Sequence, residues 1–437
     1  MNFFLGRASA LFCMLWFCDG FERLANVCDC CVGYCLRIRK FAFEMNTEKL
    51  IIYLDNNATT QIDKRVLDAM MPFLTNEFAN ANSTHQFGVA AYEAVKSARI
   101  QVADLISAEA HEIVFTSGST EAINLAIKGV AENYSSKGKH IVTVSTEHSA
   151  VLDTCKFLET KGCEVTYLSV SADGLIDLNE MKSVLREDTI LVCVMLANNE
   201  TGVLQPVKEI SDLAHAVGAL FMTDATQAVG KIPVNVDLLG IDLMCMSGHK
   251  IYSSKGVGAL YVRQRMNRVK IPALIHGGGH EKGMRSGTLN VPAIVGLGSA
   301  CAFAQKEMNK NAEHILSLRN YLESELLKVD GTSVNGNTYS RLYNTSNIFF
   351  NHADSDAVIM GLGNPESDLP LIAVSNGSAC TSASVEPSHV LTAMGLDETA
   401  AFSSIRFSLG KFNTKKEIDV VIAAVKNVVS TLRSMVS

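Results

Sequence analysis

The sequence has little proline, no repeat and no excess of positive charge. Only 8 of its 437 residues are proline, so the chain contains no proline-rich tail or linker. No repeat period is visible, which excludes a solenoid or a propeller. Lysine and arginine total 38 against 45 aspartate and glutamate, and the resulting net charge of -7 is opposite in sign to a nucleic-acid-binding surface. We therefore expect no direct binding of nucleic acid.

The N-terminal apolar stretch is also too short for a membrane span. Ala8–Cys18 falls well below the roughly 20 apolar residues that cross a bilayer, so we expect no stable membrane insertion. Hydrophobic residues make up 48% and charged residues 19% of the chain, which is typical of a globular protein and excludes a disordered chain or a fibre. At roughly 150 residues per domain, the length predicts two or three domains with a large buried core.

The main body of the chain lacks clustered cysteines. Single cysteines within apolar runs are typical of reduced core residues, so we expect a reducing, cytoplasmic environment. Cys193 and Cys245 are examples of such apolar runs. The cysteines scattered singly through the main body are Cys155, Cys163, Cys193, Cys245, Cys301 and Cys380.

Residues 1–45 form an extension that differs from the rest of the chain. Its basic residues are compatible with a targeting peptide, which would make the protein organellar, but acidic residues dilute that pattern. Upstream read-in before Met45 is an equally good explanation, and a disordered extension is the third. The cysteines at Cys28–Cys35 lack the paired C-x-x-C spacing of a zinc site and a nearby histidine, so we expect no bound metal.

Short apolar runs alternate with longer amphipathic segments from Ile51 onward, which predicts an α/β fold with a parallel or mixed sheet. A helix is expected at Glu121–Glu132 because its apolar residues recur at helical spacing. Open α/β sheets bind ligands at the carboxyl ends of their strands, so the loops there should converge on one site. The expected strands are Glu112–Phe115, Ile141–Val144, Ile190–Met195, Ala219–Met222, Leu243–Met246 and Gly258–Val262.

Three of these loops carry side chains that together suit pyridoxal phosphate. Ser119 and Thr120 lie in a polar turn that leads directly into a helix, whose backbone N–H groups and dipole favour a phosphate. Asp224 ends a buried strand, where its charge needs a cationic partner. Lys250 places an amine at the same sheet edge. The cofactor's aldehyde requires an amine and its pyridine nitrogen requires a carboxylate, so these loops supply all three needs.

An ordered set of motifs resembles the cysteine desulfurases, which are class V aminotransferases among the fold-type I pyridoxal-phosphate enzymes. The resemblance runs from Tyr53 to near the C-terminus. It implies an α/β fold with a large cofactor-binding domain at 63–305, built on a central, mostly parallel sheet. A smaller α+β domain would combine 46–62 with 306–437. The motifs are Tyr53-Leu-Asp-Asn-Asn-Ala-Thr-Thr60, Phe115-Thr-Ser-Gly-Ser-Thr-Glu121, Thr146-Glu-His148, Asn198-Asn-Glu200, Asp224-Ala-Thr-Gln227, Ser247-Gly-His-Lys250, Gly277-Gly-Gly-His-Glu281, Arg285-Ser-Gly-Thr288 and Gly377-Ser-Ala-Cys-Thr-Ser382.

The resemblance also implies a role for individual residues. Lys250 would be the Schiff-base lysine, Asp224 the partner of the pyridine nitrogen, and His148 an acid–base group stacked on the ring. The remaining assignments are Asn199 and Gln227 on the ring hydroxyl, Ser119, Thr120, Ser247 and His249 on the phosphate, Thr288 on the phosphate of the second subunit of a homodimer, and Arg406 and Asn82 on the substrate. The segment around Asn82 departs from the family by lacking its usual proline.

Cys380 separates a desulfurase from an ordinary aminotransferase. It lies among small and polar residues without an apolar period, which predicts a loop and not a packed face. The resemblance then implies conversion of L-cysteine to L-alanine, with a persulfide on Cys380 passed to an iron–sulfur scaffold or a tRNA-thiolation protein. It also suggests that Cys380 ligates an iron–sulfur cluster during transfer.

Three alternatives stay open at this point. A class V aminotransferase and a selenocysteine lyase would share the cofactor site. A non-catalytic interaction protein would be expected to have lost Lys250 or Cys380, and both are present.

Overall fold

A computed structural model describes residues 50–265, 267–367, 370–377 and 386–436 of the chain. The predicted extension at 1–45 and Cys380 therefore lie outside the described residues. Among the helices of the described part, none is long and apolar enough to cross a membrane.

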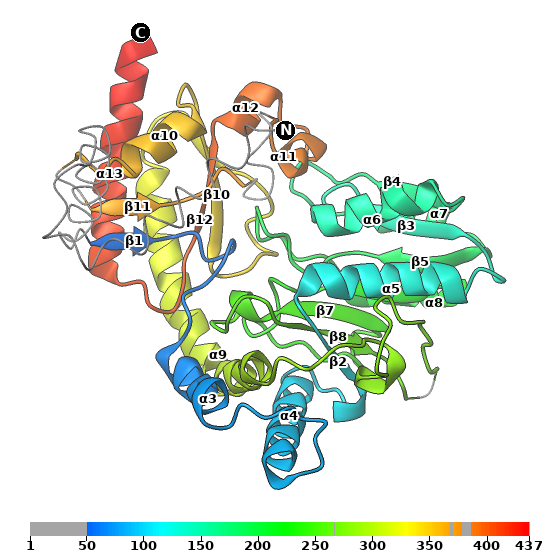
Figure 1. The fold of residues 1–437 in the computed structure, drawn as a ribbon. Coiled ribbons are helices and arrows are strands. Elements are labelled where there is room, and N and C mark those ends of the chain that lie inside the picture. Colours follow the sequence, from blue (N-terminus) through cyan, green and yellow to red (C-terminus); the bar gives the residue numbers. More distant parts are fainter. Residues whose placement is uncertain (1–49, 266, 368–369, 378–385, 437) are drawn as a thin grey trace, which may run out of the picture. The chain divides into compact units, whose positions relative to one another are not determined.

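A seven-stranded sheet forms the centre of the larger core (Figure 1). Strand β8 is antiparallel to both of its neighbours, β2 and β7, and the remaining pairs are parallel. This confirms the predicted mostly parallel α/β sheet, and each predicted strand is present within a few residues. In spatial order the strands are β2 (Ile113–Thr116), β8 (Gly258–Val262), β7 (Leu243–Ser247), β6 (Leu220–Asp224), β5 (Thr189–Cys193), β3 (His140–Val144) and β4 (Glu164–Leu168).

The central strands are buried along nearly their whole length because helices cover both faces of the sheet. Alternate residues of β7 show the division, since Leu243 and Cys245 belong to one apolar cluster and Met244 and Met246 to the other. Helices α5 (Ser119–Asn133) and α6 (Ser149–Glu159) pack in the first cluster. The second cluster includes residues of α3 (Lys64–Thr75), α4 (Gln86–Leu105), α7 (Leu178–Val184), α8 (Val207–Ala216) and α9 (Val291–Leu326).

A second apolar core lies around two smaller sheets. Strands β12, β10 and β9 form an antiparallel sheet, and β1 pairs in parallel with β11. Three helices complete this region, namely α10 (Ser355–Leu362), α13 (Lys415–Val436) and the C-terminal half of α9. The strands are β1 (Ile51–Tyr53), β9 (Thr332–Val334), β10 (Thr345–Phe350), β11 (Leu371–Ala373) and β12 (Ser404–Ser408).

Helix α9 joins the two cores. Leu297 packs in the core of the seven-stranded sheet, whereas Leu322 packs in the second core. The predicted division at 305 and 306 therefore falls within this continuous helix, and the two-domain description stays a prediction. The short elements are η1 (Ala110–Glu112), η2 (Gly248–Lys250), η3 (Glu281–Gly283), α11 (His389–Ala393) and α12 (Glu398–Phe402).

Candidate functional site

The loops at the carboxyl ends of the central strands line a cavity of about 600 Å³, a volume that suits a cofactor. This confirms the expected convergence of these loops. The sequence-predicted residues that line the cavity are Ser119, Thr120, His148, Asn199, Asp224, Gln227, Ser247, His249, Lys250 and Arg406.

Lys250 lies in η2, the turn that follows β7. Its Nζ donates hydrogen bonds to the backbone oxygens of Asn57 and Ala58 at 2.5 and 2.6 Å. The turn after β1, from the second core, therefore holds the amine at the cavity.

Asp224 is the last residue of β6, and its side chain is buried. Its Oδ1 accepts hydrogen bonds from the Thr226 N–H at 2.9 Å and from the Cys245 thiol at 3.2 Å. A buried carboxylate is thus present where a protonated ring nitrogen would need one.

The start of α5 and η2 form the side of the cavity that the sequence predicts to bind the phosphate. Ser119 and Thr120 occupy the first positions of α5, where N–H groups lack helical partners. Burial, followed by the charges of nearby lysines, lowers the pKa of His249 to about 4, so this ring is neutral near pH 7. Its Nδ1 contacts the Thr59 hydroxyl at 3.1 Å.

His148 caps the N-terminus of α6. Its Nδ1 accepts a hydrogen bond from the Ala150 N–H at 3.1 Å. The neutral ring therefore carries its proton on Nε2.

A buried lysine that sequence reasoning missed holds Gln227. Lys231 donates to the backbone oxygen and the Oε1 of Gln227 at 2.9 and 3.1 Å, and Gln227 Nε2 donates to the Asn57 oxygen at 2.9 Å. Burial, and next the charge of Lys250, lowers the pKa of Lys231 to about 7. These contacts fix the orientation of the Gln227 amide.

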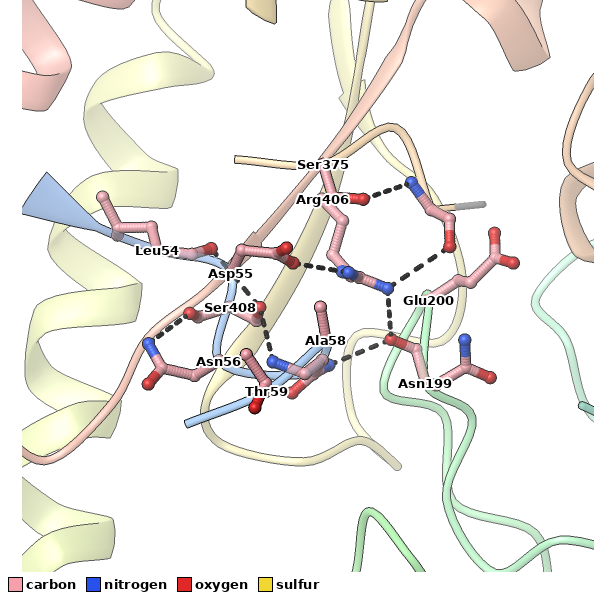
Figure 2. Close-up of polar contacts among 12 residues, drawn as sticks. Leu54, Asp55, Asn56, Ala58, Thr59, Asn199, Glu200, Ser375, Arg406 and Ser408 are labelled. Carbon is pink, nitrogen blue, oxygen red and sulfur yellow. Dashed lines mark hydrogen bonds and ion pairs between the residues drawn. The ribbon is translucent and has the colours of Figure 1, made fainter. Parts of the chain in front are cut away.

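Arg406 is a fully buried cation at the wall of the cavity (Figure 2). Its Nη2 pairs with Asp55 Oδ1 at 2.6 Å. Its Nη1 donates to the backbone oxygens of Asn199 at 3.1 Å and Gly377 at 3.4 Å. The guanidinium thus joins β12 to the turn after β1, the loop after β5 and the segment that leads to Cys380.

Glu200 lies close to the chain on both sides of residues 378–385. A Cβ atom on Gly377, which has φ +100°, would lie 2.4 Å from Glu200 Oε2, so only glycine fits beside this carboxylate. On the other side, Ser388 Oγ donates to the same oxygen of Glu200. Glu200 therefore brings the two flanks of this segment together.

Three predicted residues are not brought into the cavity by the described structure. Asn82 and Thr288 are exposed and do not line it, and Cys380 lies outside the described residues. Their assigned roles stay predictions.

Several residues at or next to the cavity were not assigned by sequence reasoning. Asn57 and Asp55 belong to the motif at Tyr53–Thr60, and the polar run after the apolar residues Leu50–Leu54 was the signal that could have found them. Glu200 was likewise part of a family motif, whereas Lys231 gave no local signal, because lysine is common in turns.

The donor set fits pyridoxal phosphate. An amine, a buried carboxylate and a helix N-terminus with hydroxyl groups surround one cavity, as the aldehyde, the ring nitrogen and the phosphate require. Within the described part of the chain, no group of three or more His, Cys, Asp or Glu side chains could hold a metal ion.

Comparisons with known proteins agree with this chemistry. The family model Aminotransferase class-V matches residues 52–421. The cysteine desulfurase IscS of Haemophilus influenzae strain PittGG is 54% identical over 390 residues, which cover 89% of this chain and 95% of that protein. A solved NifS-like protein has a TM-score of 0.80 and 38% identity, covering 87% of this chain and 99% of its own. SspA, solved in complex with cysteine, has a TM-score of 0.72 and 38% identity, and the match covers 83% of this chain and 100% of the SspA chain.

The buried Arg406–Asp55 pair predicts a measurable loss of stability when its anion is removed. Asp55→Asn should lower the free energy of unfolding by about 2–3 kcal/mol, because the guanidinium stays buried without a countercharge. Asp68→Asn, which removes the anion of the exposed pair with Lys64, should cost no more than about 0.5 kcal/mol. Urea unfolding of both variants makes the comparison, and equal losses would contradict the structural role of the pair.

Lys231 predicts a pH dependence of stability. Its pKa is about 7 when folded against 10.5 ordinarily, so between these values the unfolded chain binds more protons and stability rises with pH. The contribution is at most about 1.4 kcal/mol per pH unit. In Lys231→Met, the free energy of unfolding measured with urea should rise less steeply between pH 7 and 10 than in wild type. The exposed control Lys208→Met should keep the wild-type slope, and a wild-type slope in Lys231→Met would refute the prediction.

Proposed function

The chain belongs to the cysteine desulfurase family of the class V aminotransferases, and we propose that it converts L-cysteine to L-alanine and passes the sulfur through Cys380. Its α/β fold is that of the fold-type I enzymes. One observation carries the proposal: Lys250, Asp224, the start of α5 and Arg406 surround one cavity.

We propose that pyridoxal phosphate is the cofactor. Lys250 would hold its aldehyde carbon, Asp224 its ring nitrogen, and Ser119, Thr120, Ser247 and His249 its phosphate. When bound, the cofactor supplies an electron-withdrawing ring that stabilises negative charge at the substrate Cα. Asn199 and Gln227 would contact the ring hydroxyl, with Gln227 oriented by Lys231.

Arg406 is the proposed binding group for the substrate carboxylate. A guanidinium binds a carboxylate through two parallel hydrogen bonds. Because Arg406 already pairs with Asp55 and two backbone oxygens, it is held in place before substrate arrives. Preorganisation of this kind lowers the entropic cost of binding.

Two side chains would move protons. Once displaced from the aldehyde carbon, the Lys250 amine removes the Cα proton of cysteine. His148 would be the acid–base group for the substrate thiol proton. Because its Nδ1 accepts a hydrogen bond from the Ala150 N–H, that exchange would take place at Nε2.

Cys380 would take the sulfur. Its thiolate attacks the substrate sulfur, a new S–S bond forms, and the Cβ–S bond breaks. The electron pair of that bond stays with Cβ, which is then protonated, and Lys250 would return the proton to Cα, so that alanine is released and Cys380 is left oxidised to a persulfide. Gly377, three residues earlier, lines the cavity, which supports delivery of Cys380 to this place.

We further propose that the acceptor is an iron–sulfur scaffold or a tRNA-thiolation protein, and that Cys380 ligates a cluster as cargo during transfer. The buried, free cysteines Cys155, Cys193, Cys245 and Cys301 support a reducing cytoplasmic location.

We also propose that the protein is a homodimer with Thr288 of each subunit at the partner's phosphate site. Exposed apolar side chains gather on α3, on α4 and between them, an arrangement that favours burial against another protein surface. They are Leu67, Met71, Leu74, Phe78, Phe87, Val89 and Tyr92. Thr288 is exposed, as a contribution to a second subunit requires.

Cys380→Ser tests the proposed reaction. The variant should keep its bound cofactor, but alanine release from cysteine should fall at least about 100-fold, because a serine hydroxyl is almost wholly protonated near neutral pH. Cys163→Ser, at a partly buried thiol that follows the turn after α6 and does not line the cavity, should release alanine at the wild-type rate. Normal alanine release by Cys380→Ser would favour an ordinary aminotransferase or lyase.

A further inference from the structure

The two oxygens of Asp224 are in different environments. Oδ1 accepts from the Thr226 N–H at 2.9 Å and from the Cys245 thiol at 3.2 Å. Oδ2 receives no hydrogen bond from any residue in the described part of the chain. The carboxylate is buried and lines the cavity.

The parallel register of the sheet explains the thiol contact. Asp224 on β6 and Cys245 on β7 are directly paired, so their side chains project from the same face of the sheet. Cys245 is fully buried. Burial, followed by the charge of Asp224, raises the pKa of the Cys245 thiol well above its ordinary value. The group is therefore a protonated thiol that donates to the carboxylate.

We propose that Cys245 is a positioning residue for the reaction: its S–H, together with the Thr226 N–H, occupies Oδ1 and turns Oδ2 toward the cofactor's ring nitrogen. This inference rests on the proposed function, because the ring nitrogen is the group that Oδ2 would meet. Cys245 does not line the cavity and would act only through Asp224.

A purely space-filling role is the alternative to this inference, and Cys193 provides the matched control. It lies on β5, the strand on the other side of β6, is equally buried, and belongs to the same apolar cluster as Cys245. Its side chain makes no hydrogen bond with Asp224. Truncating either thiol removes the same atoms from the same core, but only Cys245→Ala removes a donor from Asp224.

The first experiment is infrared spectroscopy of the S–H stretch in the full-length protein. A wild-type minus Cys245→Ala difference spectrum isolates the band of Cys245, and wild type minus Cys193→Ala isolates that of Cys193. The Cys245 band should lie at a lower wavenumber than the Cys193 band, because the Cys245 thiol donates to a carboxylate. In Asp224→Asn the Cys245 band should move to higher wavenumber, because a neutral amide is a weaker acceptor. A Cys245 band unmoved by Asp224→Asn would overturn the inference without involving the cofactor.

The second experiment measures the dissociation constant of pyridoxal phosphate for the same variants. Cys245→Ala should weaken binding about three- to tenfold, the usual effect of one hydrogen bond. Cys245→Ser keeps a donor and should bind within about twofold of wild type, as should Cys193→Ala.

These variants distinguish a failure of the inference about Cys245 from a failure of the proposed function. Suppose that Asp224→Asn weakens cofactor binding but Cys245→Ala and Cys193→Ala have the same dissociation constant for pyridoxal phosphate. The inference is then wrong and the proposed function stands. If Asp224→Asn binds pyridoxal phosphate as tightly as wild type, the assignment of Asp224 to the ring nitrogen fails first.

Discussion

Burial of the Arg406 guanidinium is the constraint on which the arrangement of the site depends. A permanent charge in the protein interior is tolerated only when it is paired and hydrogen-bonded. Asp55 supplies the countercharge, and the backbone oxygens of Asn199 and Gly377 supply acceptors. These partners come from both cores, so satisfying one cation brings together the turn after β1, the loop after β5 and the flank of the Cys380 segment (Figure 2).

Charged groups of both signs line the cavity. Lys250 and Arg406 line it, and the amine of Lys231 lies behind Gln227, while the neutral His249 adds no further charge. Asp224, the buried carboxylate at the end of β6, needs a cationic partner, and a protonated ring nitrogen would supply one. A phosphate would meet the N–H groups at the start of α5, and a substrate carboxylate would share the Arg406 guanidinium with Asp55.

The sheet and much of the site could be predicted because their signals are local. Apolar runs mark the strands, and the residues after them, such as Asp224 and Lys250, reach the cavity because strand ends share one sheet edge. Asn57 and Asp55 could be matched to a motif, but their roles depend on contacts with Lys250 and Arg406, which lie far along the chain. Lys231 could not be identified, since only burial distinguishes it from a surface lysine. The donation from Cys245 to Asp224 depends on the register between two strands, which periodicity does not determine.

The central claim is that the amine of Lys250 holds pyridoxal phosphate in this cavity. Reduction of the purified protein with borohydride fixes the cofactor to the lysine that carries it, and peptide mass spectrometry then identifies that residue. We expect the added pyridoxyl phosphate mass on the peptide that contains Lys250, and we expect it to be absent after Lys250→Ala. A modified Lys231 or Lys255, or a protein that carries no added mass after incubation with the cofactor, would contradict the account.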